Sequence, residues 1–423
     1  MNSKKYTLLL SIASVLEVLL YTTWSKSFGA KSSAVLFTFV SLSIPFLAFK
    51  AKSEGALDWK IKVFNSNKVQ WSIFIVGGLA YLMLLSRHIL DFPFEAFPDK
   101  MVFSDTIPQI MVLVERFQNF EFPYTTIQWN QYSLFPTYLP LQWFPYMIPQ
   151  LIALDYRIFA ALCFLFVLGW MVLRGNKEIR SSYFRLLLIS IALLLLFLNL
   201  SRHWFDVGST VESFIAAYYL FLGFAILFRK PKLIWLGVLF CLFSRYAIVL
   251  WIPALLFYQV LYLGRRTALT TLGILILGGI VIYGPFLLKD WTIYLQGYQY
   301  HSKAALGEWT RLNVYGYPMH LTKGMGWAIM GHDFFSGSVA QRLVLWQNVH
   351  LTASILSVAV PAVFVYLKRE VLNLDYTFVL LSTLKLYLVV FYSFIQIPYT
   401  YLFIVPVSMS LPLLYHSLKK MEI

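Results

Sequence analysis

The sequence predicts an all-α protein that crosses a membrane many times. Hydrophobic residues make up 59% of the 423 residues and charged residues only 13%, with a mean hydropathy of +0.70. A typical soluble protein has about 25% charged residues. Apolar runs of roughly 20 residues, the length of a membrane-spanning helix, recur along the chain. These runs are continuous rather than alternating, which argues against a membrane β-barrel.

About twelve spans are expected, within a range of about 10 to 13, from the length that a helix needs to cross a bilayer. The apolar runs lie at about 6–24, 33–49, 71–86, 158–173, 185–200, 211–228, 232–244, 247–263, 268–288, 350–367, 376–394 and 399–416. The first run is long, carries Glu17 and lacks a small-residue cleavage site. We therefore expect a retained span rather than a signal peptide.

Basic residues lie between the apolar runs, in "KAKSEGALDWKIKVFNSNK", "RGNKEIRSSYFR", "RKPK", "GRR", "KRE" and "KKMEI". If both termini are cytoplasmic, nearly all of these clusters face the cytoplasm, as the positive-inside rule requires. This topology requires that the segment 136–154, which contains four prolines, does not cross the membrane. We expect it to lie on the outer leaflet or dip into it, as an interfacial helix does.

The spans and loops divide the chain into four parts. These are a two-span hairpin with a cytoplasmic loop (1–70), a transmembrane core with a first outside loop at about 87–157 (71–288), a second large outside loop (289–349) and a three-span segment (350–423). The outside loops lack long polar stretches suited to glycosylation. This favours a bacterial plasma membrane, with the functional site facing the periplasm or exterior.

Several functions are not expected from this composition. The net charge of +15 follows from the positive-inside pattern and does not indicate a nucleic-acid partner. Cys163 and Cys241 both lie in apolar runs, so a disulfide framework is not expected. The histidines are scattered and no D-x-D motif occurs, so a metal site is not expected. The sequence contains no Walker loop, which argues against ATP-driven transport.

The stretch "FSDTIPQIMVLVERFQNFEFPY", from Phe103, predicts an amphipathic helix in the first outside loop. Its apolar residues recur at the spacing of one helix face. Asp105 stands just before this helix and Pro108 lies in its first turn, which is typical of a helix start. Asp105 is therefore either a helix cap or a carboxylate held at the outer membrane interface.

The order of motifs here resembles the first extracytoplasmic loop of the GT-C glycosyltransferases. An outside aspartate and an amphipathic helix are followed by "EFPY", "PTYLPL" and "LDYR". The resemblance is strongest over about 104–162 and weaker over 206–258. It is closest to the mannosyltransferase-like branch, which uses polyprenyl-phosphate sugars.

The sequence departs from the family pattern at three points. Two additional spans precede the loop. Thr106 stands where many relatives have a second acid, which leaves Asp99 and Asp91 as alternatives to Asp105. Arg245 stands where the family frequently has lysine, and the two residues differ in hydrogen-bonding geometry.

The resemblance implies an inverting, metal-independent transfer of a hexose such as mannose. The sugar would leave a polyprenyl phosphate and join an acceptor hydroxyl on a glycan, glycolipid or protein, with one general base. Beyond membrane lipid and this lipid-linked co-substrate, no cofactor is implied. The expected base is Asp105. The expected donor-phosphate residues are Arg245, Arg202 and Lys303, and the expected sugar or acceptor residues are Glu121, Tyr138, His203, His301, Trp309 and Arg311.

Other interpretations of these residues and of the chain stay open. Arg245 is also consistent with an interfacial snorkelling residue, and the loop aromatics with an aromatic belt. A transporter or lipid flippase would need charges inside the membrane, where Glu17 and Lys385 lie. The sequence does not say whether these two meet. A polysaccharide polymerase or ligase, and a non-catalytic assembly subunit, are the remaining alternatives.

Overall fold

The structure is a computed structural model that describes residues 2–24, 27–53, 66–91, 104–128, 133–179, 181–202, 210–322 and 324–419. Within these residues the fold is almost entirely helical. The one sheet in this part pairs two short antiparallel strands, β1 (Ile127–Gln128) and β2 (Ser133–Leu134). The predicted all-α membrane architecture is therefore confirmed.

Ten helical segments of the described part are long and apolar enough to cross a membrane. They comprise α1 (Asn2–Leu19) with the π-helical η1 (Leu20–Trp24), α2 (Ala30–Ser53), α3 (Asn67–Asp91), α7 (Tyr156–Glu178), α8 (Ser182–Arg202), η5 (Tyr246–Trp251) with α12 (Ile252–Leu263), α13 (Arg265–Lys289), α16 (Val339–Lys368), α17 (Tyr376–Phe394), and η6 (Thr400–Phe403) with α18 (Ile404–Ser408) and α19 (Ser410–Leu418). The shorter apolar helices α10 (Glu212–Leu227) and α11 (Pro231–Leu242) bring the set to the expected twelve.

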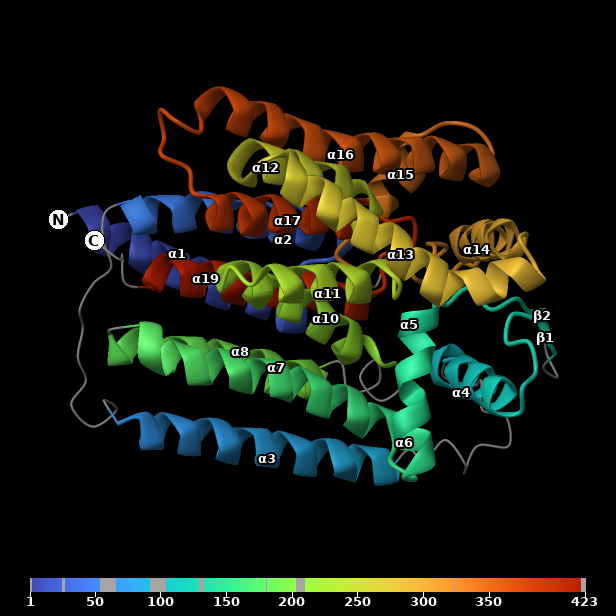
Figure 1. The fold of residues 1–423 in the computed structure, drawn as a ribbon. Coiled ribbons are helices and arrows are strands. Elements are labelled where there is room, and N and C mark those ends of the chain that lie inside the picture. Colours follow the sequence, from blue (N-terminus) through green and yellow to red (C-terminus); the bar gives the residue numbers. More distant parts are fainter. Residues whose placement is uncertain are drawn as a thin grey trace.

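The long helices run side by side, and the remaining elements gather at one end of the bundle (Figure 1). These are α4 (Thr106–Gln118), α5 (Pro140–Trp143), η4 (Phe144–Tyr146), α6 (Met147–Leu151), α14 (Ile293–Thr310) and α15 (Ala328–Phe334). The α5–α6 series crosses this end instead of running with the long helices. The segment 136–154 therefore does not span, as predicted. Both chain termini lie at the opposite end.

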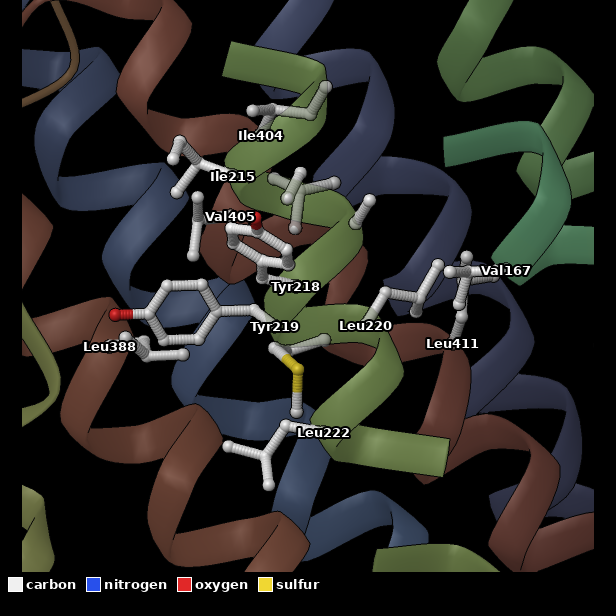
Figure 2. Packing of buried hydrophobic residues seen from close by; sticks show 14 of the residues in the cluster. Val167, Ile215, Tyr218, Tyr219, Leu220, Leu222, Leu388, Ile404, Val405 and Leu411 are labelled. Atoms are coloured by element: carbon white, nitrogen blue, oxygen red, sulfur yellow. The ribbon is translucent and has the colours of Figure 1, made fainter. Parts of the chain in front are cut away.

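Helix α10 forms the centre of the bundle, because it is apolar on every side. Figure 2 shows Tyr219 of α10 beside Leu388 of α17, with Val405 of α18 close by and Leu222 further along α10. All four side chains are buried. Gly237 of α11 lets α11 approach α10 closely, since a Cβ at this position would lie 3.0 Å from the Leu222 backbone. Small residues commonly serve this purpose in membrane helix pairs.

The basic segments predicted to share one side of the membrane do meet at one end of the bundle. Asp375 caps α17 and pairs with Lys52 from α2. Arg229, in the turn between α10 and α11, lies 3.5 Å from the same carboxylate, and His416 of α19 lies 3.4 Å from it. Three segments that are distant in sequence thus converge on one acid at the start of α17.

Glu17 and Lys385 meet in the interior of the bundle and are both completely buried. The hydroxyl groups of Ser41 and Ser410 also donate to the Glu17 carboxylate. The Lys385 ammonium donates in addition to the carbonyl of Pro406, at 2.6 Å. The network joins α1, α2, α17, α18 and α19. Its partners match what a buried ion pair requires, namely an opposite charge and further hydrogen bonds.

We expect Lys385→Met to lower the free energy of unfolding by about 3–5 kcal/mol, because it leaves the Glu17 carboxylate buried without a counter-charge. The double variant Glu17→Gln/Lys385→Met should lose less of its free energy of unfolding than the single variant, since it removes both charges. Denaturant unfolding in detergent micelles measures both effects. Lys368→Met, at an exposed lysine, is the matched control. A Lys385→Met protein as stable as this control would contradict the prediction.

Candidate functional site

A cavity of about 2070 Å³ lies at the end of the bundle that carries α4 and α14. Its wall comes from the start of α4, the start of α10, the turn before η5, one face of α14 and the segment 395–402. Pockets for a single small ligand usually enclose about 300–1,000 Å³. The cavity therefore has room for more than one small ligand.

Six of the ten predicted site residues line this cavity. They come from distant parts of the chain: Asp105, Tyr138, Arg202, Arg245, His301 and Arg311. Five separate segments of the chain thus bring their polar side chains to one place. The sequence had assigned these residues to the same side of the membrane, and the structure gathers them around a common space.

Of the other four predicted residues, the structure describes three, and these do not line the cavity. Trp309 is fully buried in a second hydrophobic cluster, where its indole nitrogen donates to the Gln396 carbonyl at 2.9 Å. Lys303 on α14 and Glu121 after α4 are exposed and do not line the cavity. His203 lies outside the residues that the structure describes.

Asp105 directly precedes α4, at the position of a helix cap, but its side chain accepts no hydrogen bond from the first turn. Only its backbone carbonyl bonds into the helix, accepting from Gln109 N–H at 2.9 Å. The residue lines the cavity together with Tyr138. Burial raises the pKa of Tyr138, and the negative charge of Asp105 adds to this rise. The position thus fits a cap, while the side chain does not form the capping bond.

Of the two alternative acids, the structure describes one. Asp91 is the exposed last residue of α3 and does not line the cavity. Asp99 lies outside the described residues. Of the two candidates for a general base that the structure describes, Asp91 and Asp105, Asp105 lies in the cavity wall.

Arg245 forms an ion pair with Glu212 in the cavity wall. Its Nη2 lies 2.6 Å from Glu212 Oε2, and the two side chains are 19% and 6% exposed. Arg245 precedes η5 and Glu212 opens α10, so the pair also joins two neighbouring helices. A guanidinium carries five N–H donors, so a single bond to Glu212 does not exhaust them. The sequence did not single out Glu212, although it stands directly before a long apolar run.

One face of α14 forms a wall of the cavity. Gly297, His301, Ala304, Glu308 and Arg311 follow one another three or four residues apart and all line it. This is the spacing of a single helix face. The segment was expected to be a loop, but it forms a helix of 18 residues. Desolvation inside the cavity lowers the pKa of the His301 imidazole from its ordinary value.

A second ionisable pair lies on this wall. Glu308 Oε2 is 3.2 Å from His320 Nε2. The His320 ring packs edge-on against Tyr399, with centroids 5.3 Å apart, and Tyr399 stacks on Tyr401 at 5.4 Å. All four residues line the cavity. The sequence did not identify this pair as a site.

Gly324 allows the chain around His320 to press against the segment that carries Tyr399. A Cβ at Gly324 would lie 2.0 Å from the Pro398 carbonyl oxygen. The same junction is held by a hydrogen bond from Trp327 N–H to the Ser393 carbonyl, at 2.7 Å. Close backbone approach of this kind requires glycine.

The fold and the cavity together define a polytopic helical membrane protein with a large cavity at one end of its bundle. No family model, curated protein or solved structure matches the chain. The function is therefore argued from the residues of the cavity.

We expect Gly324→Ala to lower the free energy of unfolding by about 1–3 kcal/mol, because the added methyl group forces the Pro398 backbone to move. Gly273 of α13 provides the matched control, since a Cβ added there would meet no atom of the described residues within 4 Å. Gly273→Ala should be neutral or stabilising by about 0.5–1 kcal/mol, since alanine favours a helix interior. Thermal unfolding of the two variants in the same detergent makes the comparison, and equal midpoints would contradict it.

Proposed function

We propose that this protein is a membrane glycosyltransferase that transfers a sugar from a polyprenyl phosphate to an acceptor hydroxyl. The observation that carries the proposal is the shared cavity of Asp105 and Arg245. The first supplies a carboxylate that can accept a proton. The second supplies a largely buried cation suited to a phosphate.

The reaction is a direct displacement. The acceptor oxygen attacks the anomeric carbon as the bond from that carbon to the phosphate oxygen breaks, and the phosphate leaves with the electron pair. Asp105 accepts the proton of the acceptor hydroxyl, and the anomeric configuration is inverted. Arg245 stabilises the negative charge of the leaving phosphate, and a preorganised cation in a partly buried site does this more effectively than water.

The charge pattern supports an outward-facing site. Basic residues gather at the end of the bundle opposite to the cavity, around Asp375. The positive-inside rule assigns that end, with both termini, to the cytoplasm. The cavity then opens on the other side, which in a bacterial plasma membrane is the periplasm or exterior. A polyprenyl chain would remain in the bilayer while its phosphate reached Arg245.

A transporter or flippase is less well supported. Such proteins use charged groups along a path through the membrane. Glu17 and Lys385 are fully buried, bonded to each other, and do not line the cavity. Their partners Ser41 and Pro406 hold them further in place. The pair therefore fits a structural role, which is to hold the helices of the bundle together.

We expect Asp105→Asn to reduce sugar transfer by about 10²–10⁴-fold, the usual contribution of a general base. The assay uses purified protein in lipid nanodiscs, a panel of polyprenyl-phosphate sugars and a chelator. Asp91→Asn makes the same chemical change outside the cavity and should retain wild-type transfer. Thermal unfolding checks that both variants are folded.

Unchanged transfer by a folded Asp105→Asn protein would remove this residue as the base. Loss of transfer in Asp91→Asn would move the assignment to Asp91. Absence of transfer and of donor binding in the wild type, across the whole panel, would contradict the proposed function and favour a transporter or an assembly subunit.

We also expect Arg245→Lys to weaken binding of a short isoprenyl phosphate such as farnesyl phosphate. Lysine keeps the charge, so Glu212 retains a partner, but it lacks the planar fork that binds phosphate through two bonds. Isothermal titration measures the affinity, and the loss should be about tenfold, or roughly 1.4 kcal/mol. Arg229→Lys, at the opposite end of the bundle, serves as control. Equal affinities in the two variants would argue against phosphate binding at Arg245.

A further inference from the structure

The proposed reaction uses the part of the cavity near Asp105 and Arg245 and leaves a second polar group unexplained. This group contains Glu308, His320, Arg311 and Tyr399, which all line the cavity. We call these four residues the Glu308 subsite. They come from the last turn of α14, the turn after it, and the segment after α17.

The Glu308 subsite is built from fixed parts. The Glu308–His320 pair is 3.2 Å long, with side chains 22% and 27% exposed. The backbone N–H of Met319 donates to the Arg311 carbonyl at 2.9 Å, which holds His320 next to the end of α14. Gly324 presses the same turn against Pro398, the neighbour of Tyr399. The side chains therefore face the cavity in a defined arrangement.

The Glu308 subsite shares its cavity with the proposed reaction centre. Burial raises the pKa of Tyr399, and the negative charges of Glu308 and Asp105 both add to this rise. The Tyr399 hydroxyl is thus within the electrostatic reach of both acids. A ligand held at Glu308 would occupy the same cavity as Asp105, the residue that we expect to accept a proton. At about 2070 Å³, the cavity can hold this ligand and the donor together.

The chemistry of the subsite favours an uncharged ligand with many hydroxyl groups. Glu308 and Arg311 carry opposite charges, so the local charge offers no excess cation for a second phosphate. A carboxylate accepts hydrogen bonds from hydroxyls, a guanidinium donates to them, and an imidazole can do either. The stacked rings of Tyr399 and Tyr401 add an apolar surface for the C–H face of a sugar ring.

We propose that the Glu308 subsite binds a saccharide, and that the acceptor in the transfer reaction is therefore a sugar hydroxyl. This assignment rests on the proposed function and narrows its acceptor from a glycan, glycolipid or protein to a saccharide. The saccharide is either a free oligosaccharide or the headgroup of a glycolipid. Glu308 and His320 bind its hydroxyls, and Asp105 takes the proton of the one that attacks.

The test compares Glu308→Gln and His320→Gln with the wild type in nanodiscs. Three quantities are measured: KM for soluble oligosaccharide and for glycolipid acceptors, KM for the lipid-linked donor, and hydrolysis of the donor by water. We expect the acceptor KM to rise about tenfold or more, whereas donor KM and hydrolysis stay within twofold of wild type. Glu370→Gln makes the same chemical change at an exposed residue at the other end of the bundle and is the control.

A separate measurement does not depend on catalysis. Saturation-transfer NMR detects binding of the same oligosaccharides and glycolipid headgroups to the wild type, and this signal should fall in Glu308→Gln. An effect on oligosaccharides alone, or on glycolipids alone, identifies the source of the sugar. His320→Asn provides a second variant if His320→Gln does not fold.

The outcomes separate the two proposals. Unchanged acceptor KM and unchanged NMR signals in both variants would overturn the Glu308 subsite. Efficient transfer to peptides or sugar-free lipids alone would also overturn it, while leaving the glycosyltransferase proposal intact. Saccharide binding that depends on Glu308, in a protein that transfers nothing, would support the subsite and overturn the proposed function. If the protein neither binds saccharides nor transfers sugar, both the Glu308 subsite and the proposed function are overturned.

Discussion

The buried ion pair between Glu17 and Lys385 holds together the part of the bundle on which the cavity depends. Lys385 lies on α17 and also donates to Pro406 on α18, so its bonds join the helices before and after the segment 395–402. That segment supplies Tyr399 and Tyr401 to the cavity wall. Because the helices on either side of this segment, α17 and α18, are bonded to each other, the positions of its two tyrosines are fixed.

The cavity lies at the end of the bundle opposite to the chain termini. At this end of the bundle, α4, the α5–α6 series and α14 lie beyond or across the ends of several long helices (Figure 1). On α14, polar side chains reach the cavity wall from a helix whose other face is packed. Glu308 faces the cavity, whereas the neighbouring Trp309 is buried in a separate cluster and bonded to Gln396.

Local signals made the membrane helices, α4 and the non-spanning segment 136–154 predictable, because run length, apolar spacing and prolines are visible in a single stretch of sequence. The ion pairs were not predictable, because their two partners lie far apart in the sequence. Glu17 and Lys385 are 368 residues apart, and Glu212 and Arg245 are 33 apart. α14 was missed because its mixed polar and aromatic residues face a cavity on one side, so no continuous apolar run identifies it as a helix.

The separation between Glu17 and Lys385 also has a consequence for biogenesis. At translation rates of about 5–20 residues per second, Lys385 is synthesised roughly 20–70 s after Glu17. During that interval α1 would hold an acidic group in the bilayer, where a charge costs about 2.5–3.5 kcal/mol by insertion scales. Ser41, 24 residues later on α2, is its first hydrogen-bonding partner. The helical hairpin of α1 and α2 is thus a provisional assembly, completed only when α17 enters the membrane.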